Sequence, residues 1–208
     1  MKLYTPIVLE GQEWVVPRQE DNLEWLWALH GNQQLAAWHP PRVDFLRARE
    51  NGFPLEYSDF PWLTGGVLIL RARALQVLGP TLGDYGEVLP LVCDEPVSLL
   101  NVTTLIDALD NEASRVACFD DGSILEVEKY VFRPEAIGEA QLFRLPADVL
   151  RQSPIYLQEP LVRRIGESGL SGVAFDLVWM DETAPMENTR IEYSSEASPV
   201  AHPSGQAL

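Results

Sequence analysis

The sequence predicts an α+β fold that is mostly antiparallel sheet, with a few short helices. Three observations support this. Helical and strand-like patterns follow one another in irregular order, and a hairpin-turn dipeptide, Asp121-Gly122, separates two strand-like segments. The third is composition, because 46% apolar and 22% charged residues are typical of a folded globular protein. At 208 residues the chain is long enough to bury a substantial core, as one large domain or two small ones.

The first third of the chain predicts short strands. Residues 3–9, 12–16 and 42–48 have strand-like patterns, whereas the Trp-rich segment 23–30, LEWLWALH, fits either a strand or a helix. The next segment, SDFPWLTGG at residues 58–66, is punctuated by Pro and Gly. It is the position at which the sequence allows a boundary between subdomains.

We therefore expect three regions. The first is a Trp-rich N-terminal subdomain over residues 1–57, and the second is an α+β domain over residues 58–180. The third is residues 181–208, where the chain becomes polar and rich in Pro and Ser, so we expect disorder apart from an edge strand at TRIEY.

Within the second region the elements follow in order. A helix is expected from about Arg71 to Leu82, with Leu75 and Leu78 facing inward and Gly83 just beyond its end, although Gly79-Pro80 offers an earlier stop. Residues 87–93 and 96–102 read as an antiparallel pair of strands, and Pro90 suits an edge or a bulge because it cannot donate to a central ladder.

The clearest local pattern is the hairpin at residues 115–132, centred on Asp121-Gly122. Short strands are expected at 141–145 and 155–157. An amphipathic helix follows at 159–167, with Pro160 in its first turn and Gly169 as a left-handed cap, and then a strand at 173–179 in the middle of a sheet.

Charge limits the classes of partner. There are 31 acidic residues against 15 Lys and Arg, giving a formal net charge of −16. Such a field repels nucleic acid and anionic membranes, so we expect neither as a partner and favour a basic protein. Residues 84–128 hold eleven acidic residues and one basic residue, Arg115. The alternative is that these acids only keep the surface soluble.

Catalytic and metal-binding patterns are largely missing from the sequence. The histidines lack partners at zinc-ligand spacing, and there is no phosphate-binding Gly loop or nucleophile elbow. We therefore predict no catalytic residue, no metal site and no cofactor. Glu10 and Glu13 interrupt the first apolar run, which predicts a cytoplasmic protein. Cys93 and Cys118 are expected to be buried free thiols.

One pair of carboxylates keeps an enzymatic alternative open. In LLNVTTLIDALDNEAS, residues 99–114, a helical turn over 104–111 would place Asp107 and Asp110 on one face. Paired carboxylates are the groups that glycoside hydrolases use. A carboxylate-based hydrolase is therefore the alternative to a binding protein.

Four blocks of sequence carry a resemblance to a known family. These are LLNVTTLIDALDNEAS, DDGSILEVEKYVF, LFRLP and PIYLQEPLVRRIGESGLSGVAFDLVW, in that order. Together, over about residues 58–180, they resemble a bacterial polymorphic-toxin immunity family, the myxobacterial-type "immunity eleven" group. The resemblance implies a protein that binds and neutralises a cognate secreted toxin without catalysis.

Charge and resemblance together suggest a partner and a contact surface. Many such toxins are basic because they bind nucleic acid, which makes a nuclease a candidate partner, and an acidic surface would then stand in for phosphate and speed encounter. The candidate partner-binding residues are Asp94, Glu95, Asp107, Asp110, Glu112, Asp120, Asp121, Glu126 and Glu128. Some of them, Asp107 and Asp110 above all, could instead cap turns and helix ends. A chaperone or adaptor for toxin secretion is a further alternative.

Overall fold

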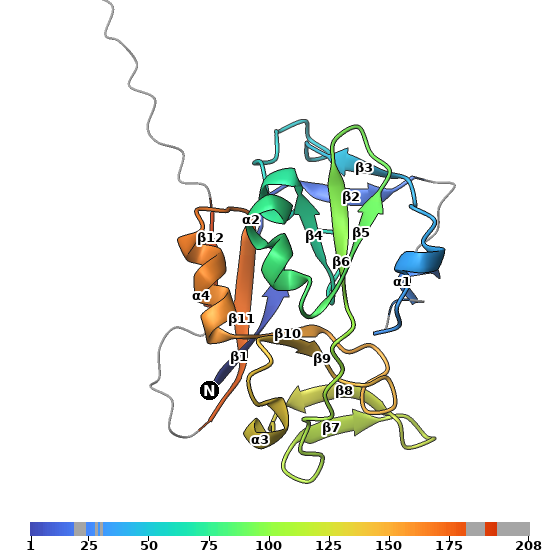
Figure 1. The fold of residues 1–208 in the computed structure, drawn as a ribbon, viewed down its shortest axis with the longest axis vertical. Helices are drawn as coiled ribbons and strands as arrows, with labels where there is room; N and C mark the ends of the chain where they lie inside the picture. Colours follow the sequence, from blue (N-terminus) through green and yellow to red (C-terminus); the bar gives the residue numbers. More distant parts are fainter. Residues whose placement is uncertain (19–23, 28, 30, 182–189, 195–208) are drawn as a thin grey trace, which may run out of the picture.

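The computed structural model describes residues 1–18, 24–27, 29, 31–181 and 190–194 (Figure 1). Its largest element is a five-stranded sheet in the order β12-β11-β1-β10-β9, in which every neighbouring pair is antiparallel. Its strands are β1 (Lys2–Ile7), β9 (Leu142–Arg144), β10 (Ile155–Gln158), β11 (Val173–Met180) and β12 (Arg190–Tyr193). The predicted edge strand at TRIEY is therefore present as β12.

A three-stranded antiparallel sheet, β4-β6-β5, forms the second layer. It consists of β4 (Leu68–Arg71), β5 (Gly86–Leu91) and β6 (Val97–Val102), with helix α2 (Ala72–Leu82) between β4 and β5. β5 is an edge strand, which confirms the expectation from Pro90. Helix α2 runs to Leu82 with Pro80 inside it, so Gly79-Pro80 does not end it early.

Two small sheets and several short helices complete the fold. The sheets are β2 (Trp14–Pro17) with β3 (Val43–Leu46), and β7 (Arg115–Cys118) with β8 (Ile124–Lys129). The helices are α1 (Glu24–Trp27), the 3₁₀ turn η1 (Leu35–Ala37), α3 (Pro134–Ile137) and α4 (Glu159–Glu167). None of the helices in the described part of the chain is long and apolar enough to cross a membrane.

The buried apolar side chains form three clusters, and the alternation of side chains along the strands keeps these clusters on different faces of the sheets. In β1, Leu3 and Tyr4 point to opposite faces of the five-stranded sheet, so each face has its own core. One core lies between the two larger sheets and includes the buried faces of α2 and α4. The second lies under the β7–β8 hairpin, and the third between the three-stranded sheet and β2–β3. The β7–β8 hairpin and the β2–β3 sheet lie at opposite ends of the molecule (Figure 1).

Local expectations for the later helix and its cap are confirmed. Helix α4 has Pro160 in its first turn and buries Leu161, Val162 and Ile165. Gly169 follows with φ 69°, the left-handed conformation that glycine adopts without strain. The observed mixture of small antiparallel sheets and short helices is a mostly-sheet α+β fold, as predicted.

The helical turn over residues 104–111, on which the hydrolase alternative depends, is not formed. Leu105 pairs with Arg144 and Leu109 with Phe132 through isolated β-bridges, so the segment is extended up to Asp110. Tertiary pairing overrides the helical spacing of the acids here. The expectation for the cysteines is wrong at Cys118, which is exposed, while Cys93 is half-buried; both are free thiols.

The segment 58–61 lies in the interior. Ser58 and Asp59 are fully buried, and the Ser58 hydroxyl donates to the Gly172 carbonyl at 3.0 Å. Asp59 accepts a bond from the Ser171 amide at 2.9 Å. The division into subdomains at residues 57 and 58 stays a prediction, and the structure pairs β1 of the first range with β10 and β11 of the second. Most of the predicted tail, 181–208, lies outside the described residues.

Candidate partner-binding surfaces

The nine predicted acids occupy two separate places. Asp94 and Glu95 lie in the turn between β5 and β6. The other seven lie on β8, on the β7–β8 turn, or on the segment that leads into β7. Figure 1 shows the β5–β6 turn and the β7–β8 hairpin at opposite ends of the long axis. The acidic run therefore does not form one continuous surface.

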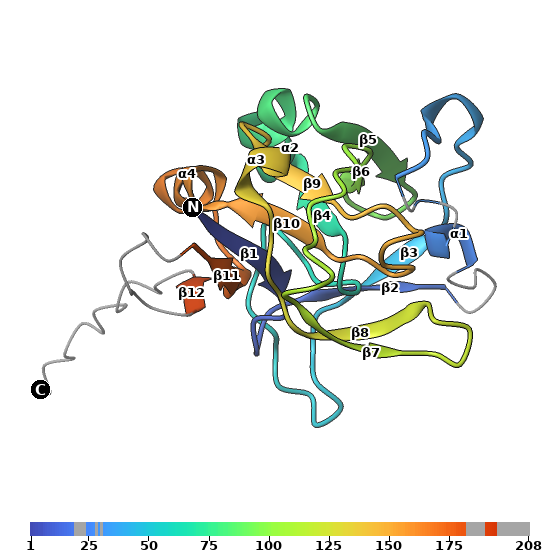
Figure 2. The same cartoon turned by 90° about the horizontal axis from the view of Figure 1, so that it is seen from below.

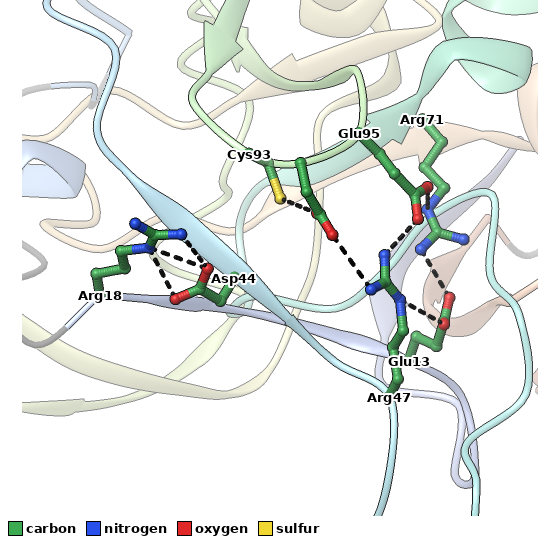
Figure 3. A network of polar contacts seen from close by, with 8 residues as sticks. Glu13, Arg18, Asp44, Arg47, Arg71, Cys93 and Glu95 are labelled. Carbon is green, nitrogen blue, oxygen red and sulfur yellow. Dashed lines mark hydrogen bonds and ion pairs between the residues drawn. The ribbon is translucent and has the colours of Figure 1, made fainter.

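Asp94 and Glu95 belong to an ionic network with two arginines and Glu13 (Figure 3). Arg47 contacts both acids, with Nη1 3.3 Å from Asp94 Oδ2, and its Nε lies 3.6 Å from Glu13 Oε1. Arg71 Nη2 lies 2.8 Å from Glu13 Oε2, and its Nε lies 3.6 Å from Glu95 Oε2. The network joins the residue before β2, the residue after β3, the end of β4 and the β5–β6 turn.

Aromatic rings hold the central guanidinium of this network. Arg71 Cζ lies 4.1 Å from the centroid of the Phe45 ring and 4.4 Å from that of Tyr57. The Arg71 side chain is only 4% exposed, so its charge needs Glu13 and Glu95 nearby. Glu95 is therefore a structural partner of a buried cation as well as a surface acid.

The neighbouring thiol adds a local contact. Cys93 Sγ donates to Asp94 Oδ1 at 3.1 Å, and this bond, followed by the contact with Arg47, holds the pKa of Asp94 below its ordinary value. Burial raises the pKa of the Cys93 thiol. The thiol is consequently kept in its less reactive, protonated form.

Asp107 and Asp110 each have separate structural partners. Asp107 Oδ1 accepts a bond from Arg133 Nη2 at 3.0 Å. Asp110 Oδ1 accepts bonds from the amides of Glu112 and Ala113, both at 3.0 Å, and so caps the turn that follows. The capping alternative is confirmed for Asp110. The two carboxylates lie on an extended segment, without the shared helix face on which the hydrolase alternative depended.

Two acids in the hairpin also have local partners. Asp121 Oδ1 accepts bonds from the Ser123 hydroxyl at 2.6 Å and the Ser123 amide at 2.9 Å, and these bonds lower the pKa of Asp121. Gly122 completes the turn with φ 82°. On the strands, Glu128 pairs with Arg115 Nε at 2.5 Å.

Among the described residues, the carboxylates of three acids have neither an ion pair nor a hydrogen bond: Glu112, Asp120 and Glu126. All three are exposed. The hairpin also exposes two apolar side chains, Phe119 at 46% and Leu125 at 55%. Exposed apolar and charged side chains on one element are the composition typical of a protein contact surface. We call Glu112, Phe119, Asp120, Leu125 and Glu126 the hairpin surface.

A second surface, at the other end of the molecule, was not identified from the sequence. It is an open groove of about 880 Å³ beside β2 and β3. Its lining includes Glu10, Trp14, Leu46, Arg49, Glu50 and Leu55, and we call it the Trp14 groove. The Trp-rich composition of the N-terminal region was the available signal, but nothing in the sequence placed Trp14 against residues 46–55.

Comparison with known families identifies the segment that carries the acids. Residues 94–179 match the immunity protein family Imm11. The match confirms the resemblance predicted from the sequence and indicates an immunity-protein role. No curated protein matches the chain.

The Imm11 match divides the two surfaces. It begins at the β5–β6 turn, ends in β11 and includes all nine predicted acids and the whole hairpin surface. The Trp14 groove lies outside it. Among the described residues, no group of three or more His, Cys, Asp or Glu side chains is placed to hold a metal ion.

Proposed function

We propose that this chain is an immunity protein that binds a cognate toxin through the hairpin surface, without catalysis. The observation that carries the proposal is the Imm11 match, which spans the hairpin. Three acids of the hairpin surface support it, because Glu112, Asp120 and Glu126 have no ion-pair partner among the described residues. Phe119 and Leu125 supply apolar contact area that an acidic surface alone lacks.

The mechanism follows from the charges. A toxin that grips nucleic acid presents a basic surface, and the hairpin acids attract that surface over about a Debye length, roughly 8 to 10 Å at physiological salt. Encounter is therefore faster than for neutral partners. Burial of Phe119 and Leu125 in the complex then slows dissociation, and occupation of the toxin's substrate surface blocks its activity.

The test is co-expression with the protein encoded in the neighbouring reading frame. We expect that protein to stop bacterial growth alone and to be harmless when this chain is present. The triple variant Glu112→Lys, Asp120→Lys, Glu126→Lys should lower the association rate at low salt by roughly tenfold or more and flatten its salt dependence.

The matched control is a second triple charge reversal, Asp84→Lys, Asp148→Lys, Glu167→Lys. These acids are also exposed, and none lies on the hairpin surface. The control variant should keep most of the association rate of the unaltered chain, and should therefore associate several times faster than the hairpin variant at low salt. Equal association rates for the two triple variants would refute a contact at the hairpin, and failure of the unaltered chain to protect cells would refute the immunity role itself.

A further inference from the structure

The Trp14 groove has an apolar floor built by strand register. Trp14 and Leu46 are direct partners on the antiparallel strands β2 and β3, so their side chains lie on the same face. Leu46 is 44% exposed although it is a large apolar residue in a strand. Two adjacent apolar side chains in an open groove form an exposed apolar surface, and such surfaces mark interaction sites.

The outer wall of the groove is a preformed arm, residues 47–55. The Arg49 amide donates to the Phe53 carbonyl at 2.8 Å, and the Leu55 amide donates to the Arg47 carbonyl at 2.8 Å. Gly52 turns the arm with φ 82°. Phe53 near its tip is 68% exposed, the largest exposed fraction among the large apolar residues described. At its base, the contacts of Arg47 with Asp94 and Glu95 fix the arm to the β5–β6 turn.

The charged side chains in the groove lining indicate which kind of partner the groove binds. Glu10 and Glu50 line the groove and have no ion-pair partner among the described residues, whereas Arg49 is the single cation in its lining. A second copy of this chain would bring another net charge of −16 toward it, and an anionic membrane would be repelled in the same way. A segment that combines large apolar side chains with Lys or Arg is complementary to both the floor and the two acids.

The position of the arm relates the groove to the hairpin surface. Figure 2 shows that the arm and the β7–β8 hairpin project from the same side of the molecule, while Figure 1 separates them along the long axis. One large partner can therefore contact both. Two contacts on one partner strengthen binding because the second forms within an existing complex.

We propose that the Trp14 groove is a second docking site for the toxin, and that it takes an extended toxin segment with a large apolar side chain next to Lys or Arg. This inference rests on the proposed function. It adds a second apolar anchor for the partner in the groove, and Asp94 and Glu95 become positioning residues that hold the groove wall through Arg47.

The test uses the full chain and an array of synthetic 12-residue peptides in which apolar, basic and acidic residues are varied. We expect binding to peptides with an aromatic or Leu residue next to Lys or Arg, and not to their acidic counterparts. Leu46→Ser with Phe53→Ser should weaken that binding at least tenfold. Val77→Ser, at a similarly exposed apolar residue on α2, should leave it unchanged. Glu10→Lys with Glu50→Lys should abolish the preference for basic peptides.

Three outcomes would overturn the inference. The first is equal peptide binding by the Leu46/Phe53 and Val77 variants when thermal melting shows that all are folded. The second is a dimer in sedimentation that the Leu46/Phe53 variant dissolves, which would make a second copy the occupant. The third is full toxin protection and unchanged toxin affinity in the Leu46/Phe53 variant, which refutes the groove while the immunity role stands. Failure of the unaltered chain to protect would refute the immunity role while the peptide result stands.

Discussion

At the scale of single residues, the buried arginines Arg71 and Arg144 differ in whether a carboxylate pairs with them. Arg71 has Glu13 and Glu95, whereas Arg144 on β9 pairs with no carboxylate among the described residues. Arg144 is 7% exposed, its Nη2 donates to the Gly66 carbonyl at 2.6 Å, and its Nε has no hydrogen-bond partner among the described residues. Burial lowers the pKa of Arg144 to about 10, so the charged guanidinium is held at a cost of roughly 3 kcal/mol.

Replacing this residue should therefore stabilise the protein. Arg144→Met removes the buried charge but also the bond to Gly66, so we expect a net gain of about 1 kcal/mol in the free energy of unfolding at neutral pH. The exposed Arg151→Met is the control and should have little effect. Because the pKa of Arg144 in the folded protein lies below its ordinary value, the cost is full below about pH 10 and shrinks as the pH rises further. Urea unfolding at pH 7 measures the difference, and a loss of stability in Arg144→Met would contradict it.

At the scale of elements, the tightest junction joins residues 58–60 to the loop before β11. Gly172 has φ 88°, and a Cβ there would lie 2.1 Å from Ser58 Oγ and 2.6 Å from Ser58 Cα. The backbone of one segment therefore fits only against a glycine in the other. Asp59, fully buried, also bonds to Arg73 Nη1 at 2.8 Å and fixes the start of α2 to the same point.

Gly172→Ala should consequently destabilise the protein by about 2–4 kcal/mol, because the backbone is strained and the segments must separate. Gly122→Ala is the control, since Gly122 has a similar φ of 82° but no atom within 4 Å of its added Cβ. It should cost only about 1–2 kcal/mol from the left-handed conformation. Thermal unfolding of the two variants separates the cost of the contact with Ser58 from the cost of the strained backbone. Equal losses of stability would show that the contact with Ser58 adds no cost.

Elements were predictable where their signals are local. The β7–β8 hairpin, α4 with its Gly169 cap, and the edge position of Pro90 follow from residues within a few positions of one another. Residues 104–111 could not be predicted in this way, because Leu105 and Leu109 pair with Arg144 and Phe132, which are 39 and 23 positions away. The two surfaces differ for the same reason. The hairpin acids are close in sequence, whereas Trp14 and Leu46 meet only through the pairing of β2 with β3.

At the scale of the whole molecule, the formal net charge of −16 acts on stability as well as on binding. Exposed acids without partners repel one another, and salt screens that repulsion. We expect the midpoint of thermal unfolding to rise as sodium chloride is increased from 10 to about 300 mM. The Glu112/Asp120/Glu126 lysine variant is less negative and should gain less from salt. A midpoint that falls with salt would show that the ion pairs, such as those of Arg47, outweigh the repulsion.

The five-stranded sheet has a consequence for the living cell. Its central strand, β1, lies far from both of its neighbours in sequence, because Lys2 pairs with Met180 and Leu3 with Gln158. During translation β1 has no neighbour to pair with until β10 and β11 have been synthesised, and sheets closed over such distances fold slowly. The sheet therefore cannot form until residues 155–180 have left the ribosome. For the proposed role, a cell therefore needs folded copies of this immunity protein before synthesis of the toxin begins.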